Sequence, residues 1–64
     1  MSDLSKLNAL YQRLVAEQHR LVTAAAGQQV MPTESMLRQI ADIESTLTAV
    51  ATMIEDARQN GQRT

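Results

Sequence analysis

Cysteine is absent from the 64 residues, and histidine occurs only once, as His19. The chain therefore cannot form a disulfide or a thiolate metal site, and one histidine cannot build a structural zinc site alone. A chain of this length gains only about 3–5 kcal/mol from a single core. We therefore expect self-association or a partner protein to add stability. The lack of cysteine is compatible with a reducing cytoplasm, and we expect a cytoplasmic protein.

Aromatic side chains are also scarce, since Tyr11 is the only one in the chain. The apolar residues are Leu, Ile, Val, Met and Ala, which are typical of helix–helix cores, whereas sheets use aromatic and β-branched residues more heavily. This composition predicts an all-α fold, and the length predicts a single domain over residues 1–64.

A strong charge of one sign and long apolar runs are lacking as well. The net charge is −1 with both signs mixed, so the composition gives no reason to expect binding to nucleic acid or to an anionic membrane. No apolar run approaches the ~20 residues needed to cross a bilayer. The chain opens with Met1-Ser2-Asp3 rather than with basic residues and an apolar block, so we expect no secretory signal.

Two stretches carry apolar residues at alternating steps of three and four, which places them along one side of a helix as a seam. The first stretch predicts a helix over residues 3–26, capped by Ser2 or Asp3. The second predicts a helix over residues 33–59, capped by Thr33. The first seam consists of Leu4, Leu7, Tyr11, Leu14, Gln18, Leu21 and Ala25. The second seam consists of Met36, Ile40, Ile43, Leu47, Val50, Ile54 and Ala57.

Gly27 and Pro32 bound the connector between the two helices. Glycine suits the left-handed conformation that ends many helices, and proline suits a helix start. A connector of about five residues is usual between antiparallel neighbours, so we predict a helical hairpin. Val30 and Met31 are expected to fold over the end of the core. Residues 60–64 have no apolar content and are expected to form a frayed tail.

Antiparallel folding about this connector brings the two seams together. The expected neighbours include Leu7 with Met53 and Leu21 with Gln39. A single hairpin leaves the flanks of both seams exposed, and each large apolar side chain gains roughly 1.5–3 kcal/mol on full burial. We therefore expect two copies to form a symmetric four-helix bundle. The residues expected at the self-association or partner interface are Leu10, Val15, Gln18, Val22, Leu37 and Met53.

No arrangement in the sequence predicts an enzyme. His19 lies beside the seam, and Ala16 stands where a Glu-x-x-His metal motif would need glutamate. A Ser/His/Asp set would need a nucleophile elbow, a glycine-rich loop or a strand to hold it, and the pattern predicts none of these. We expect no catalytic, metal-binding or cofactor-binding residues, and we interpret His19 as a surface histidine.

Gln18 and the methionines each allow two interpretations. Gln18 interrupts the first seam, where it either bonds its twin or a backbone carbonyl across an interface, or extends toward solvent from a partly exposed position. Met31, Met36 and Met53 either belong to an ordinary bundle core or form an adaptable surface for a partner helix.

These observations favour a non-enzymatic helix–helix interaction module that self-associates and binds an amphipathic helix of a partner protein. Small secretion-apparatus chaperones and phage or plasmid accessory proteins use the same architecture. The alternative is a small helical-bundle regulator that binds nucleic acid through the row Lys6, Arg13 and Arg20. For this alternative, the predicted hairpin is similar in fold to the small dimeric regulator of plasmid copy number, which binds RNA.

Nucleic-acid binding is the weaker expectation of the two. The three cations of the row are separated by about 10 Å along the helix, Glu17 stands among them, and no aromatic side chain is placed to stack on bases. Binding to a membrane surface is not expected, because the polar sides of the helices are not strongly basic.

Overall fold

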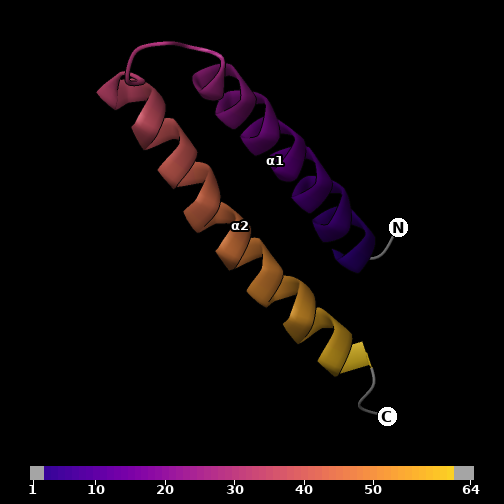
Figure 1. Ribbon diagram of the computed structural model, residues 1–64. Coiled ribbons are helices and arrows are strands. Elements are labelled where there is room, and N and C mark those ends of the chain that lie inside the picture. The colour runs from indigo at the N-terminus through magenta and orange to yellow at the C-terminus, as the bar shows by residue number, and fades with distance from the viewer. Residues whose placement is uncertain (1–2, 62–64) are drawn as a thin grey trace.

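The computed structural model describes residues 3–61 and consists of two α-helices joined by a short connector (Figure 1). Helix α1 spans Asp3–Ala26, and helix α2 spans Glu34–Gly61. The helices pack side by side in opposite directions, and α2 extends past the N-terminal end of α1 (Figure 1). The all-α helical hairpin predicted from the two seams is confirmed.

Side-chain capping explains where α2 begins. The backbone N–H of Met36 donates to Thr33 Oγ1 at 3.1 Å, and the backbone N–H of Leu37 donates to the Thr33 carbonyl at 3.0 Å. The first bond satisfies a donor of the first turn that has no backbone partner within the helix, and the second is the first backbone bond of the helix. Thr33 is therefore the N-cap, as predicted.

The helix boundaries otherwise follow the sequence with one difference. Helix α1 covers the predicted range, and the alternative cap Ser2 lies outside the described residues. Helix α2 ends at Gly61, two residues beyond the predicted end at Gln59, so the segment expected to be a tail begins inside a helix. The remaining residues of that segment, 62–64, also lie outside the described part of the chain.

Gly27 ends α1 without the left-handed conformation that we expected. Its N–H donates to the Thr23 carbonyl at 3.1 Å, and the N–H of Gln28 donates to the Ala25 carbonyl at 3.2 Å. The φ of Gly27 is not positive, so this residue continues the right-handed turn of α1 before the chain leaves the helix. A Cβ at this position would lie 3.6 Å from its nearest neighbours, which is ordinary contact. The expectation of a left-handed cap was wrong.

Val30 and Met31 do not cover the end of the core. Their side chains are 74% and 80% exposed, which contradicts the expectation that they fold over it. The connector arcs beyond the ends of both helices (Figure 1), and among residues 27–33 only Pro32 is half-buried.

Burial follows the two predicted seams. Among the residues whose burial the structure describes, only Leu21 and Val50 are buried, with 7% and 5% of their surface exposed. Every other residue of both seams is half-buried. The seams therefore face each other along the hairpin, but two helices alone cannot enclose them.

The hairpin is elongated and exposes a large surface. Its Cα radius of gyration is 15.1 Å, against about 11 Å expected for a compact domain of this length. Its accessible surface is 5107 Å², which exceeds by about 1,000 Å² the value of about 4,100 Å² expected for a compact monomer of 7.1 kDa. Neither described helix combines the length and the hydropathy that a membrane span requires.

Candidate interaction surface

A side-chain hydrogen bond joins the two helices across the hairpin. Gln18 Nε2 donates to Glu44 Oε2 at 2.9 Å. Gln18 is half-buried and Glu44 is exposed, so the amide reaches from the seam to the opposite helix. The acceptor is a carboxylate of the same hairpin, which neither interpretation of Gln18 included. The sequence could not identify this partner, because the bond joins residues far apart along the chain.

The predicted neighbours across the hairpin are confirmed by the hollows between the helices. Leu7 and Met53 line one hollow, and Leu21 and Gln39 line another. Each pair was expected from antiparallel folding about the connector. The register therefore allows the remaining exposed residues to be placed relative to one another.

Heptad positions divide the rest of the hairpin into two faces. With Leu4 at position a of α1 and Met36 at position d of α2, positions e and b lie on one side of the seam, and positions g and c lie on the other. The hollows agree with this division, because two of them are lined by c, d and g residues of both helices. A third hollow is lined by a, b, e and f residues.

The valine face is the side that carries positions e and b. Val22 and Leu37 are 46% and 45% exposed, and both lie toward the connector end of the hairpin. Thr48 and Thr52 extend the face along α2, where their hydroxyls donate to backbone carbonyls at 3.2 and 3.1 Å. Those hydroxyl donors are used within the helix, so the threonines add little unsatisfied polarity. The valine face comprises Tyr11, Val15, Gln18, Val22, Leu37, Glu44, Thr48, Ala51 and Thr52.

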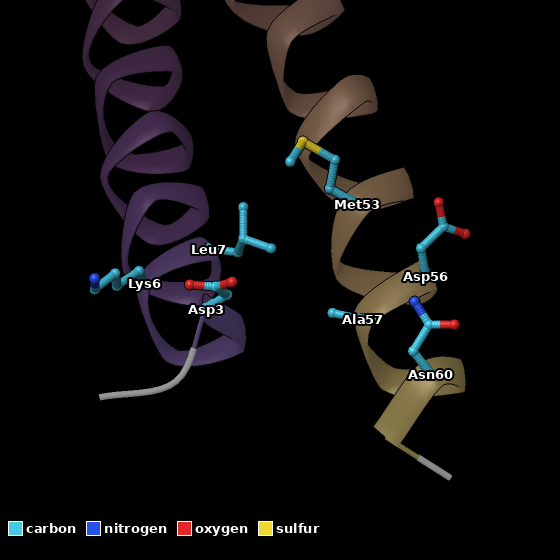
Figure 2. Close-up of a pocket in the computed structure, with 7 residues that line it drawn as sticks. All are labelled: Asp3, Lys6, Leu7, Met53, Asp56, Ala57 and Asn60. Carbon is cyan, nitrogen blue, oxygen red and sulfur yellow. The ribbon is translucent and has the colours of Figure 1, made fainter. Parts of the chain in front are cut away.

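The charged-edge face is the side that carries positions g and c. Leu7 and Met53 point toward each other across a hollow of about 420 Å³, and Met53 is 55% exposed (Figure 2). Lys6 points outward from α1, and the carboxylate of Asp56 points outward from α2 (Figure 2). The centre of this face therefore combines the apolar Leu7, Leu10 and Met53 with the acids Asp3 and Glu17, between edges of opposite charge. It comprises Lys6, Leu7, Leu10, Arg13, Glu17, Arg20, Asp42, Thr46, Ala49, Met53 and Asp56.

The basic row predicted from the sequence forms the α1 edge of this face. Lys6, Arg13 and Arg20 are all exposed. Arg20 Nη2 lies 2.6 Å from Glu17 Oε2, and Arg20 Nε donates to Glu17 Oε1 at 2.9 Å. These hydrogen bonds and the opposite charge lower the pKa of Glu17 and raise the pKa of Arg20. Arg20 is therefore already paired with an acid of its own helix.

Acidic residues form the α2 edge of the same face. Asp42 and Asp56 occupy the heptad position of the basic row, and they lie across the hollows from Arg20 and Lys6. Within residues 3–61, neither carboxylate makes an ion pair. The sequence shows Asp42 and Asp56 among the acids of the second helix, and their shared heptad position is the signal that separates them from the others as one edge.

The six predicted interface residues do not form one surface. The structure places Val15, Gln18, Val22 and Leu37 on the valine face. It places the other two, Leu10 and Met53, on the charged-edge face. Leu10 occupies position g and the two valines occupy position e, and these positions lie on opposite sides of the seam.

The titratable side chains of the described residues do not gather into a group suited to hold a metal ion. In the described part of the chain, no three histidine, aspartate or glutamate side chains lie close enough to hold a metal ion. His19 is exposed on α1.

No family model, curated protein or solved structure matches this chain.

Proposed function

We propose that this protein is a non-enzymatic helix–helix interaction module that self-associates into a four-helix bundle and binds a partner protein through apolar helix faces. The observation that carries the proposal is the exposed surface of 5107 Å² on a chain of 7.1 kDa. The excess of about 1,000 Å² is close to the ~800 Å² that each partner buries in a standard interface.

Two apolar faces give the module two places to bind. One face can be covered by a second copy while the other binds an amphipathic helix of a different protein. Such a module would act as an adaptor, a small chaperone or an accessory protein by covering the apolar side of its client. A cytoplasmic location is part of this proposal.

The alternative function, nucleic-acid binding through the basic row, has less support from the charge arrangement. Phosphates placed along the charged-edge face would meet Glu17 beside Arg20, and Asp42 and Asp56 on the opposite edge. Productive phosphate contacts require an excess of cations along the path of the backbone. This face instead presents both signs.

Sedimentation equilibrium of the wild-type chain at micromolar concentrations, with circular dichroism on the same samples, tests the proposal. We expect a dimer whose helix content falls on dilution, because assembly supplies much of the burial. A helical monomer at every concentration would contradict self-association.

A gel shift at several salt concentrations tests the alternative. We expect no retardation of RNA or DNA at physiological salt. Retardation that disappears in the double variant Arg13→Gln with Arg20→Gln would replace the proposal with the nucleic-acid regulator. Replacing Arg38 and Arg58 with glutamine in the same way removes two cations elsewhere and provides the matched control.

A further inference from the structure

We propose that the second copy packs on the charged-edge face, with α1 of each copy lying antiparallel across α2 of the other. This inference rests on the self-association proposed above, and it adds the face and the orientation. Two features of the described surface support this orientation. The first is the height of each charge, meaning its position along the long axis of the hairpin, and the second is the composition of the centre of the face.

The charges on the two edges stand at matching heights. Lys6 and Asp56 line one hollow, and two heptads further along α1, Arg20 and Asp42 line another. Each cation therefore stands level with an acid on the opposite edge of its own hairpin. The face separates them, and among the described residues neither pair forms an ion pair.

A two-fold axis parallel to the helices joins these charges between copies. Rotation about such an axis leaves the position of each residue along the helices unchanged, and it places the basic edge of one copy over the acidic edge of the other. Lys6 therefore faces the partner's Asp56, and Arg20 faces the partner's Asp42. The symmetry makes each pairing twice. A two-fold axis perpendicular to the helices would instead stack basic edge on basic edge and acidic edge on acidic edge, which is strongly unfavourable. The charges thus select one orientation.

The centre of the face fits the same arrangement. At position g, Leu10 and Met53 stand at nearly the same height on the two helices, so Leu10 meets the partner's Met53. One heptad nearer the connector, Glu17 stands level with the partner's Thr46, whose hydroxyl already donates to the Asp42 carbonyl of its own helix at 2.8 Å. Leu10 and Met53 therefore give the centre an apolar contact that the symmetry makes twice, whereas Ala24 stands level with the partner's Gln39. The apolar contacts supply affinity, and the exposed edge charges supply orientation, because such ion pairs contribute little affinity by themselves.

The valine face lacks a basic edge opposite an acidic edge, which is the feature that selects an orientation on the charged-edge face. Its α1 edge consists of the b positions Ser5, Gln12, His19 and Ala26, which include no lysine, arginine, aspartate or glutamate. The acids of this face, such as Glu44 and Glu55, lie on α2, so a second copy would present no cation on its α1 edge to pair with them. The valine face is thus left open for a protein of a different sequence.

Cross-linking of engineered cysteines tests the orientation. Because the chain has no cysteine, Arg13→Cys and Ala49→Cys each create a single reactive thiol. Both positions are exposed and stand level on opposite edges, and neither belongs to a proposed ion pair. We expect a short bismaleimide to join Arg13→Cys chains to Ala49→Cys chains in a mixture, and to join neither variant efficiently to itself.

The cross-linking outcomes separate this inference from the function it rests on. A wild-type dimer in which each variant cross-links mainly to itself, or in which neither cross-links, would overturn the orientation but keep self-association. A wild-type monomer would overturn both. Circular dichroism of each variant shows whether a missing cross-link reflects a missing fold.

Charge reversal provides a second test with a matched control. Lys6→Glu with Arg20→Glu places like charges opposite the acidic edge, and we expect the dimer dissociation constant to rise about tenfold or more. Adding Asp42→Lys and Asp56→Lys to the same chain should restore wild-type association. Arg38→Glu with Arg58→Glu changes the net charge equally, away from this face, and should have a smaller effect. Equal weakening by both pairs, or no rescue, would overturn the inference.

Discussion

The two faces of this hairpin are similar in apolar content but differ in how charge is arranged around it. The valine face presents Val15, Val22 and Leu37, all exposed, beside an α1 edge without lysine, arginine, aspartate or glutamate. The charged-edge face presents Leu10 and Met53 between a basic edge and an acidic edge. Exposed apolar side chains indicate a surface suited to binding a partner, whereas the positions of the charges along the helices indicate which partner is complementary. Only the charged-edge face complements itself.

The largest effect is expected in the buried core that lies beneath both faces. Leu21 is 7% exposed beneath both faces, and Leu21→Ala should lower the free energy of unfolding by about 2–4 kcal/mol, because it removes buried methyl groups and leaves a cavity. The neighbouring change Val22→Ala, at a position 46% exposed, should cost less than about 1 kcal/mol. Urea denaturation followed by circular dichroism at one protein concentration measures both. Equal costs would contradict the assignment of the core.

The next effect distinguishes the faces directly. Met53→Lys places a charge at the centre of the charged-edge face and should raise the dimer dissociation constant about thirtyfold, as the loss of a central interface residue commonly does. Val22→Lys makes a comparable change on the valine face and should leave the dimer intact. Sedimentation equilibrium measures both constants. A dimer that is lost in Val22→Lys and kept in Met53→Lys would interchange the roles of the faces.

Gln18→Leu should make the hairpin more stable. The change adds apolar surface to a seam, and Glu44 is exposed, so this carboxylate can bond water when it loses the amide. We expect a gain of about 0.5–1.5 kcal/mol, measured by thermal and urea denaturation. Lower stability would show that the bond from Gln18 to Glu44 contributes more than the apolar side chain that replaces it.

Gly27→Ala should stabilise α1 without touching either face. The φ of Gly27 is not positive, and an added Cβ would meet only carbonyl oxygens at 3.6 Å. Alanine restricts the unfolded chain, so the free energy of unfolding should rise by about 0.4–1 kcal/mol. Denaturant titration measures the change, and the dimer dissociation constant serves as the control. Destabilisation would indicate that the turn requires glycine.

The smallest effect concerns the ion pair between Glu17 and Arg20. Its hydrogen bonds lower the pKa of Glu17 in the folded state, so the pair adds stability above the ordinary glutamate pKa of 4.5 and loses it as pH falls through the folded value. Both side chains are exposed, which keeps the contribution small. NMR titration should show a lowered pKa of Glu17 that returns toward 4.5 in Arg20→Gln. An unchanged pKa in that variant would contradict the pairing.

The sequence was sufficient for the helices, their order and their inward sides, because these depend on local spacing. Every residue of the two seams is buried or half-buried, and Thr33 caps α2 as expected. Leu10 and Met53 lie on one side of the seams and Val22 lies on the other, and the sequence pattern alone did not divide the expected interface residues between these two faces. The bond from Gln18 to Glu44 depends on the relative rotation of the helices, which short-range patterns do not specify.

Errors at the connector have a different origin. A glycine after a helix commonly adopts the left-handed conformation, but Gly27 continues the right-handed turn instead. Val30 and Met31 were expected to cover the core on the basis of their hydrophobicity alone. The path of the connector beyond the helix ends leaves them exposed, and nothing in their local sequence indicates that path.

Within the residues whose burial the structure describes, the hairpin buries only Leu21 and Val50. Under the proposed association, most of the burial occurs between chains, so the folded fraction rises with the number of copies in the cell. Newly made chains at low abundance would remain open to proteases, and chains above the dissociation constant would persist. Synthesis rate would then set a threshold below which the protein is removed, without any dedicated regulatory site.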